Sequence, residues 1–267
     1  FIDTILKEHH IFITPGNIED DLSKLNNIDW VIEVIIENLE IKRKLYHKIA
    51  KNIGSETILS SNTSTLPRSE LIAEMSENLS SRFLITHFFN PPRYLPLLEV
   101  VSAPDVDSEI LNRFCSFADL QLGKRVTMCN DSPGFIGNRL GIYFIQRAYK
   151  ATIDHELSIE DTDAMLGRPI GLPKTAVFGL MDLVGIDLIP HVTESLLSYL
   201  PASDPFHKIA GTGKKTIISM IDEGYTGRKG KGGFYRLNSE EGKKVKEARN
   251  LITGKYSPVN RRAGFPS

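Results

Sequence analysis

The sequence predicts an α/β fold in which a doubly wound, largely parallel sheet is followed by a mainly α-helical second domain. Short apolar runs alternate with helical patterns over the first half of the chain, which is typical of a sheet covered by helices on both faces. Strand signals become nearly absent after about residue 130. The chain has 267 residues, 41% of them apolar, and this is enough for two domains with cores of their own.

The strands of the first half are predicted from short apolar stretches bounded by turn residues. They cover residues 10–14, 30–36, 57–61, 82–89, 97–103 and 125–129. Helical periodicity predicts helices between them, over residues 39–53, 67–75 and 108–122. The pattern leaves open an antiparallel direction for the later strands.

The second domain is predicted to open with a long helix in the segment DSPGFIGNRL. Asp131 or Ser132 would cap this helix and Pro133 would lie in its first turn. Further helices are expected over residues 158–166, 174–183 and 187–200. We therefore expect domains at residues 1–130 and 131–267, with a polar and loosely held stretch at the end of the second.

Charge and cysteine content exclude several classes of function. A net charge of −1 favours neither nucleic acid nor an anionic membrane as partner, and no apolar run is long enough to cross a bilayer. Cys115 and Cys129 have neither metal-ligand nor redox-motif spacing, so we expect reduced packing residues in a cytoplasmic protein. No metal-ligand pattern is visible, and the expectation is that the chain binds no metal.

Polar residues follow or interrupt three successive predicted strands. They are Glu37 and Asn38, then Asn62, Thr63 and Ser64, and then His87. Because ligands bind outside the carboxyl ends of parallel strands, we expect these side chains to line one edge of the sheet. Each cluster taken alone is better explained by helix caps and turns, but three clusters on one edge are less easily explained in this way.

His87 and Glu99 are each a polar residue inside an apolar stretch, LIT-H-FF and LPLL-E-VV. An unpaired buried carboxylate is costly and a buried imidazole needs a hydrogen-bond partner. A mutual hydrogen bond would solve both problems and leave the second ring nitrogen of His87 as a base. The alternative is a buried pair that serves only the core.

Asn138 lies on the apolar stripe of the predicted long helix, three residues after Phe135. Its carboxamide is either a satisfied core group or a ligand contact. Gly134, Gly137 and Gly141 would let a ligand or another backbone approach closely, although helix packing also explains them.

Several fragments of the chain, in this order, resemble the 3-hydroxyacyl-CoA dehydrogenase family. They are VIEVIIENLEIK, ILSSNTSTL, HFFNPPRY with LLEVV, DSPGFIGNRL, GLMDLVGID and GRKGKGGFYR, spread over about residues 26 to 236. HFFNPPRYLPLLEV and GLPKTAVFGLMDLVGID are most similar to the bacterial branch in which this module belongs to a multifunctional β-oxidation protein. The resemblance implies a Rossmann-like first domain and NAD-dependent oxidation of (3S)-3-hydroxyacyl-CoA to 3-oxoacyl-CoA.

The resemblance also implies roles for individual residues. His87 would be the catalytic base and Glu99 would orient it, while Ser64 and Asn138 would hydrogen-bond the reacting oxygen or the nearby acyl group. The positions expected to contact NAD are Glu37, Lys42 and Asn62. The helical domain would form a homodimer, and GRKGKGG, at residues 227–233, would be a turn, although its basic residues could also contact phosphate.

One family feature is missing from this sequence. No G-x-G-x-x-G occurs in the 267 residues, whereas the family opens with this loop, which holds the pyrophosphate at a helix N-terminus. We interpret the chain as N-terminally truncated, with an incomplete Rossmann-like sheet. The second hypothesis is therefore an impaired fragment that binds acyl-CoA or only dimerises.

Overall fold

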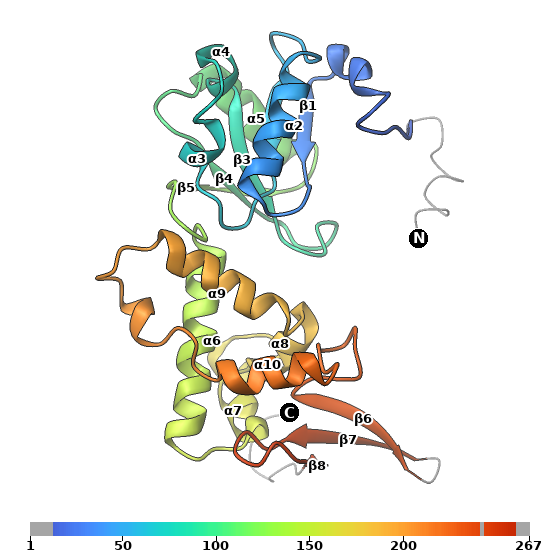
Figure 1. The fold of residues 1–267 in the computed structure, drawn as a ribbon, viewed down its shortest axis with the longest axis vertical. Helices are drawn as coiled ribbons and strands as arrows, with labels where there is room; N and C mark the ends of the chain where they lie inside the picture. Colours follow the sequence, from blue (N-terminus) through green and yellow to red (C-terminus); the bar gives the residue numbers. More distant parts are fainter. Residues whose placement is uncertain (1–12, 241–242, 260–267) are drawn as a thin grey trace. The chain divides into compact units, whose positions relative to one another are not determined.

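The structure, a computed structural model, describes residues 13–240 and 243–259 (Figure 1). The chain forms two compact units, Phe1–Phe135 and Ile136–Ser267, which divide a few residues after the boundary expected from sequence. Of the strand predicted at residues 10–14, the first three residues lie outside the described part. Ile13 and Thr14 are not in a strand.

The first unit contains a five-stranded sheet in the order β1-β2-β3-β4-β5. Its strands are β1 (Trp30–Glu33), β2 (Ile58–Ser61), β3 (Phe83–Phe88), β4 (Leu97–Val101) and β5 (Arg125–Cys129). Neighbouring strands are parallel except β3 and β4, which pair antiparallel. The largely parallel sheet is confirmed, and the direction left open for the later strands is antiparallel at one pair.

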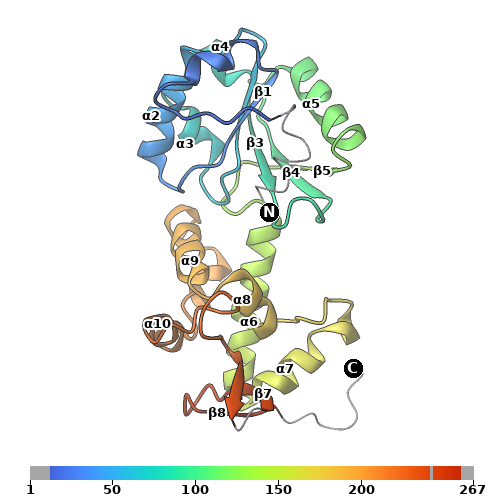
Figure 2. The ribbon, with the colours of Figure 1, turned by 90° about the vertical axis from the view of Figure 1, so that its right-hand side faces the viewer.

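Helices cover both faces of this sheet, as predicted. A short 3-10 helix η2 (Leu22–Asn27) precedes β1, and the helices of the unit are α2 (Leu39–Ala50), α3 (Arg68–Ile72), α4 (Glu77–Ser80) and α5 (Ser108–Leu120). Figure 2 shows α2 and α3 on one face and α5 on the other. Asn38 caps α2 and Asp107 caps α5 through their side chains. The core under α5 joins strand and helix residues, among them Leu84, Val100 and Phe114.

The predicted start of the long helix in the second unit is wrong. Helix α6 (Gly137–Asp154) has Ile136 at its N-cap, with no side-chain cap. Asp131 instead accepts hydrogen bonds from the backbone N–H groups of Arg68 (2.6 Å) and Ser69 (2.9 Å), and so caps α3. Helix α6 begins several residues later than the local signal indicated, because Gly134 and Phe135 have φ of +73° and +49° and interrupt a right-handed helix before Gly137.

The second unit is mainly helical, as predicted. Its helices after α6 are α7 (Ile159–Met165), η3 (Arg168–Ile170), α8 (Phe178–Val184), α9 (Leu188–Tyr199), η4 (Pro205–Lys208) and α10 (Lys214–Asp222). Their apolar faces meet in one core that includes Tyr149, Phe178 and Phe234. No helix in the described part of the chain has the length and apolar character needed to cross a membrane.

Much of the polar end of the chain forms a sheet, which corrects the expectation of a loosely held stretch there; residues 260–267 of that stretch lie outside the described part. Strands β6 (Tyr235–Glu240), β7 (Lys243–Arg249) and β8 (Tyr256–Pro258) pair antiparallel in that order. One face of the sheet buries Ala248 against the helical core. Lys, Arg and Glu fill most of the other positions of β7, so the alternation gives only a weak strand signal.

Candidate active site

The pairing of β3 with β4 brings His87 and Glu99 together. The two residues are directly opposite each other in the antiparallel register, so their side chains leave the sheet on the same face. The distance from His87 Nδ1 to Glu99 Oε2 is 2.7 Å, and the exposed fractions are 5% and 0%. The predicted hydrogen bond between these residues is confirmed.

This hydrogen bond determines the tautomer of a neutral His87. A carboxylate only accepts hydrogen bonds, so Nδ1 carries the ring proton and Nε2 keeps its lone pair. Nε2 lies 3.3 Å from Ser64 Oγ. The rings of Phe89 and Phe135 pack at centroid distances of 4.6 and 5.7 Å from the imidazole. These aromatic side chains exclude water from a base whose orientation is fixed by Glu99.

Glu37 holds the turn that presents Ser64. Its Oε1 accepts hydrogen bonds from Thr63 Oγ1 (2.6 Å) and from the backbone N–H groups of Ser64 (2.9 Å) and Thr65 (3.1 Å). Thr63 Oγ1 in turn accepts from the N–H of Leu66. One carboxylate therefore fixes the backbone at the end of β2, and with it the hydroxyl that faces His87.

A buried network under this turn was not predicted from sequence. Glu33, at the end of β1 and 3% exposed, accepts from Lys42 Nζ (2.8 and 3.0 Å), Tyr46 OH (2.7 Å) and Ser61 Oγ (2.7 Å). Burial, followed by the charge of Glu33, raises the pKa of Tyr46 well above its usual range. Glu33 interrupts WVI-E-VII just as Glu99 interrupts LPLL-E-VV, so the same signal was available in the sequence.

The remaining candidates of the first unit are also held by the protein. Asn62 Oδ1 accepts from the backbone N–H of Phe88 (2.9 Å), which ties the ends of β2 and β3 together. Lys42 is 1% exposed and lies 3.5 Å from Glu37 Oε2, besides its contact with Glu33. Asn38 is the cap of α2, as the simpler interpretation of that residue predicted.

Asn138 belongs to the second unit, where it is the second residue of α6 and is half-buried. Its approach to the reacting oxygen stays a prediction. The structure thus brings together three of the four expected catalytic residues, His87, Glu99 and Ser64, within one unit.

The side chains at the carboxyl ends of β1 and β2 fit part of a nicotinamide dinucleotide. Glu37 keeps 37% of its side chain exposed, and Asn62 lies at the same edge. A carboxylate and a carboxamide are suitable partners for ribose hydroxyls and for the nicotinamide carboxamide. Lys42 is fully covered, so its effect on a cofactor would pass through Glu37. Among the described residues no group of His, Cys, Asp and Glu could hold a metal ion.

Two family models match the chain one after the other. The first is described as 3-hydroxyacyl-CoA dehydrogenase, NAD binding domain, and matches residues 5–132. The second, 3-hydroxyacyl-CoA dehydrogenase, C-terminal domain, matches residues 134–237. The two matches meet close to the boundary between the compact units.

Curated relatives carry related names. The chain is 44% identical to a putative fatty acid oxidation complex trifunctional enzyme of Rickettsia prowazekii, over 94% of this chain and 35% of the relative. It is 39% identical to a probable 3-hydroxyacyl-CoA dehydrogenase of Deinococcus radiodurans, over 93% of this chain and 69% of the relative. The chain therefore spans about a third of the length of the Rickettsia protein.

Solved structures have a similar fold. The crystal structure of M. tuberculosis FadB2 matches with a TM-score of 0.72 and 27% identity, covering 82% of this chain and 74% of that one. The (S)-3-hydroxybutyryl-CoA dehydrogenase PaaH1 of Ralstonia eutropha matches with a TM-score of 0.69 and 26% identity, covering 85% and 80%.

Proposed function

Because the chain belongs to the 3-hydroxyacyl-CoA dehydrogenase family, we propose that it oxidises (3S)-3-hydroxyacyl-CoA to 3-oxoacyl-CoA with NAD as the cofactor. The similarity to a trifunctional enzyme named for fatty acid oxidation supports fatty-acid β-oxidation as the setting. The observation that carries the proposal is the 2.7 Å hydrogen bond between His87 Nδ1 and Glu99 Oε2.

His87 acts as the general base in this proposal. Its Nε2 takes the proton of the substrate 3-hydroxyl as the C3–O bond becomes a carbonyl. NAD held at Glu37 and Asn62 would supply the acceptor for the hydride of C3. Glu99 keeps the ring in place and favours the imidazolium that forms, because its carboxylate lies against Nδ1 in a buried setting.

Ser64 and Asn138 hold the reacting oxygen. Ser64 Oγ lies 3.3 Å from His87 Nε2, so a substrate hydroxyl that lies to one side of both atoms could hydrogen-bond to each. Asn138 would donate its amide N–H to the same oxygen or to the nearby acyl group. These contacts would orient the C3–H bond toward the nicotinamide, which is the condition for hydride transfer.

Glu37 and Asn62 contact the ribose and nicotinamide side of the cofactor in this proposal. Lys42 supports them by its charge, since its ammonium lies 3.5 Å from Glu37 Oε2 and cannot reach a ligand itself. Glu37 therefore links two tasks, because the carboxylate that would bind the cofactor also fixes the turn that presents Ser64.

Turnover with His87→Gln tests the proposal. The protein is given (3S)-3-hydroxybutyryl-CoA and NAD, and formation of NADH is followed. We expect a loss of about a hundredfold or more, which is the contribution of a general base. The matched control is His47→Gln, because His47 is an exposed histidine paired with Glu74 on the surface, and this variant should keep wild-type turnover.

Turnover of His87→Gln near the wild-type rate would contradict the role of His87. Calorimetry with acetoacetyl-CoA on the same proteins separates binding from chemistry. Binding of acyl-CoA by the wild-type protein without any turnover would favour the alternative, a chain that binds acyl-CoA but does not oxidise it.

A homodimer and a cytoplasmic location belong to the same proposal. The helical unit exposes large apolar side chains, including Leu140 (66%), Leu183 (51%) and Val184 (54%), which a second copy of the unit would cover. Sedimentation of the protein tests this: a dimer is expected, and a monomer at micromolar concentration would contradict it.

A further inference from the structure

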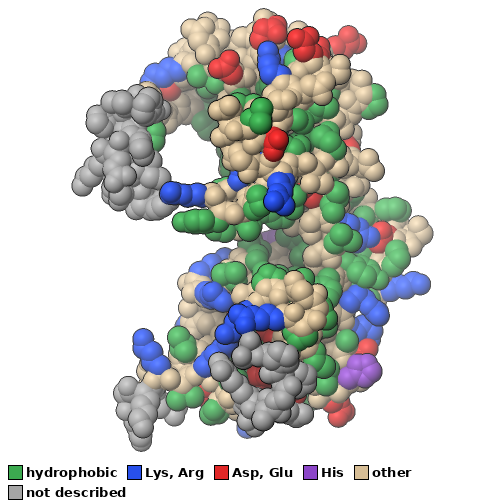
Figure 3. Space-filling model, turned by 180° about the vertical axis from the view of Figure 1, so that it is seen from behind, with side chains coloured by type: hydrophobic (Ala, Val, Ile, Leu, Met, Phe, Trp, Pro, Cys, Tyr) green, Lys and Arg blue, Asp and Glu red, His purple; other side chains and the backbone are tan. Residues whose placement is uncertain are grey.

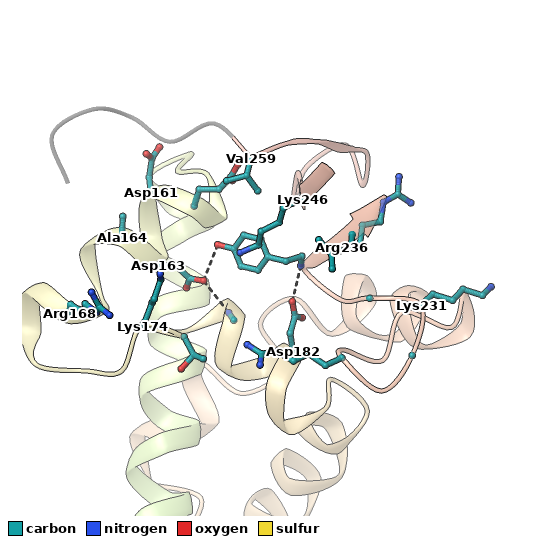
Figure 4. A pocket seen from close by; sticks show the side chains of 18 of the residues that line it. Asp161, Asp163, Ala164, Arg168, Lys174, Asp182, Lys231, Arg236, Lys246 and Val259 are labelled. Atoms are coloured by element: carbon teal, nitrogen blue, oxygen red, sulfur yellow. Dashed lines mark hydrogen bonds between the residues drawn. The ribbon is translucent and has the colours of Figure 1, made fainter. Parts of the chain in front are cut away.

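The helical unit contains a cavity that the proposed dehydrogenase reaction does not use. Its volume is about 790 Å³, and it lies between α7, α8 and β6 (Figure 4). This volume is within the range of pockets that hold small organic ligands. None of the residues assigned above to the base, the substrate or NAD lines this cavity.

The lining of the cavity is rich in cations. The basic residues are Arg168, Lys174, Arg228, Lys231, Arg236 and Lys246, and the acidic residues are Glu160, Asp161, Asp163 and Asp182. In Figure 4, Arg168 and Lys174 lie on one side and Arg236 and Lys231 on the other. Figure 3 shows Lys and Arg side chains gathered on a face of the same unit. The excess of positive charge favours an anionic ligand.

The two central carboxylates are already occupied by hydrogen bonds from the protein. Asp163 accepts from the backbone N–H groups of Val177, Phe178 and Gly179 and from Tyr235 OH. Asp182 accepts from the N–H groups of Phe234 and Tyr235. These carboxylates therefore hold the walls together, and within the described residues neither forms an ion pair with the surrounding cations.

Lys174 and Arg228 are the cations best placed to bind a ligand. Within residues 13–240 and 243–259 neither side chain forms a hydrogen bond or an ion pair. By contrast, Arg236 binds Glu247 at 2.6 Å and Lys231 donates to the carbonyl of Glu223. Lys229, next to Arg228 but outside the cavity lining, is paired with Asp187 at 2.8 Å. Of these two cations, only Arg228 has its charge acting on a carboxylate, that of Asp182, and in this part of the chain neither is held in an ion pair.

The loop that carries Arg228 is fixed by its glycines. Gly227 has a φ of +100°, and a Cβ there would overlap the carbonyl oxygen of Asp182. A Cβ at Gly233 would overlap the carboxylate of the same residue. The backbone N–H of Arg228 donates to that carbonyl at 2.8 Å. The basic loop is therefore docked on α8, and the backbone position of Arg228 is set before any ligand arrives.

The wall beside these cations can receive an organic group. Tyr235, Ala164, Leu237 and Val259 contribute to the lining, and Leu237 is 67% exposed. Lys246 Nζ lies 4.1 Å from the centroid of the Tyr235 ring, so the aromatic face carries a cation close to it. Aromatic and aliphatic surface beside basic groups suits a planar ring that bears phosphate.

We propose that this cavity binds a small organic phosphate of the nucleoside diphosphate class. Lys174 and Arg228 contact the phosphates, and the wall formed by Tyr235 and Leu237 packs against the organic part. The site would give the helical unit a ligand of its own, in addition to the substrate and cofactor of the dehydrogenase reaction.

Titration calorimetry with ADP and with inorganic pyrophosphate tests the proposal. Saturable binding of ADP is expected, with Lys174→Gln and Arg228→Gln each weakening it on the order of tenfold, the effect of losing one charge-assisted contact. Lys229→Gln is the matched control and should leave the affinity within about twofold of wild type. Thermal unfolding of each variant checks that the fold is kept.

Three outcomes would overturn the proposal. Unchanged ADP affinity in both Lys174→Gln and Arg228→Gln would place any binding elsewhere, as would an equal loss in the Lys229→Gln control. Absence of saturable binding would leave the cavity without a phosphate ligand. ADP bound no more tightly than pyrophosphate would contradict the role of the apolar wall.

Discussion

Buried carboxylates occur in both units, but they bind different partners. In the sheet unit, Glu33 and Glu99 accept from charged or ionisable side chains, namely Lys42, Tyr46 and His87. In the helical unit, Asp163 and Asp182 accept mainly from backbone N–H groups of neighbouring segments. The same chemical group therefore orients reactive side chains in one unit and joins loops to helices in the other.

The difference has an electrostatic consequence. Backbone N–H groups carry no net charge, so they offset the desolvation of a buried carboxylate only in part. Burial raises the pKa of Asp182 to about 6, and the bonds from Tyr235 and Phe234 oppose this without cancelling it. Glu33 instead faces a full ammonium at 2.8 Å. The ionised form of a buried carboxylate is thus stabilised more strongly in the sheet unit than in the helical unit.

Lys42→Met should give the largest effect, because it leaves the charge of Glu33 buried and unpaired. Removal of one partner of a buried ion pair costs about 3–5 kcal/mol of unfolding free energy. Chemical denaturation of the protein measures this loss. The double variant Lys42→Met with Glu33→Gln, which removes both charges, should recover a large part of the stability. A single variant as stable as wild type would contradict the comparison between the units.

Asp182→Asn should give the next largest effect, with a distinctive pH dependence. The pKa of Asp182 is raised from 3.8 to about 6 on folding, so between these values the folded state binds more protons than the unfolded state. Stability from this group is therefore present at low pH and lost as the pH rises through about 6, by about 3 kcal/mol at most.

Unfolding of wild type and Asp182→Asn at several pH values measures this dependence. The difference in stability between the two proteins should shrink from about pH 4 to about pH 6, since Asn has no carboxyl proton to lose. A difference that grows over this range would mean that the backbone N–H groups stabilise the anion of Asp182 more than burial penalises it.

Glu99→Gln should reduce turnover by about tenfold to a hundredfold, which is less than the loss of the base itself. The substituted amide is neutral and no longer favours the imidazolium of His87. Fluorescence titration with NADH provides the accompanying readout, and it should be unchanged because Glu99 does not lie among the expected cofactor contacts. Wild-type turnover in Glu99→Gln would mean that the hydrogen bond between His87 and Glu99 serves only the protein core.

The smallest effect is expected at the surface pair of Lys48 and Glu19. Their side chains are 51% and 79% exposed, and the distance between the charged atoms is 3.4 Å. Such pairs contribute about 0–1 kcal/mol, so Lys48→Ala should leave the melting temperature nearly unchanged. A loss comparable to that of Lys42→Met would show that burial does not decide the strength of these pairs.

The sequence predicted strands β1 to β5 and helices α2, α3 and α5 in their order, because each of these elements carries its own periodic signal. It did not predict η2 or α4, and the described residues of the strand expected at 10–14 are not in a strand. It missed the start of α6 because Asp131 serves α3, a helix that a local window around residue 131 does not contain. It missed the sheet of β6, β7 and β8 because charged residues fill most positions of KKVKEAR, and the antiparallel pairing is visible only in three dimensions.

The candidate site was predictable to a similar extent. A histidine and a glutamate inside apolar stretches indicated a buried pair, and the structure confirms their hydrogen bond. The sequence did not reveal that Glu37 fixes the turn of Ser64, since its hydrogen bonds join residues that lie more than twenty positions apart. Nor did it indicate Tyr46, whose phenolic hydroxyl also donates a hydrogen bond to Glu33.

The central claim is that Glu99 holds the ring proton of His87 on Nδ1, so that Nε2 can act as the base. The ¹⁵N and ¹H resonances of the His87 ring report the tautomer directly. We expect a proton on Nδ1 in the wild-type protein near neutral pH, and loss of this signal or a change of tautomer in Glu99→Gln. A neutral ring with its proton on Nε2 in the wild-type protein would contradict the account.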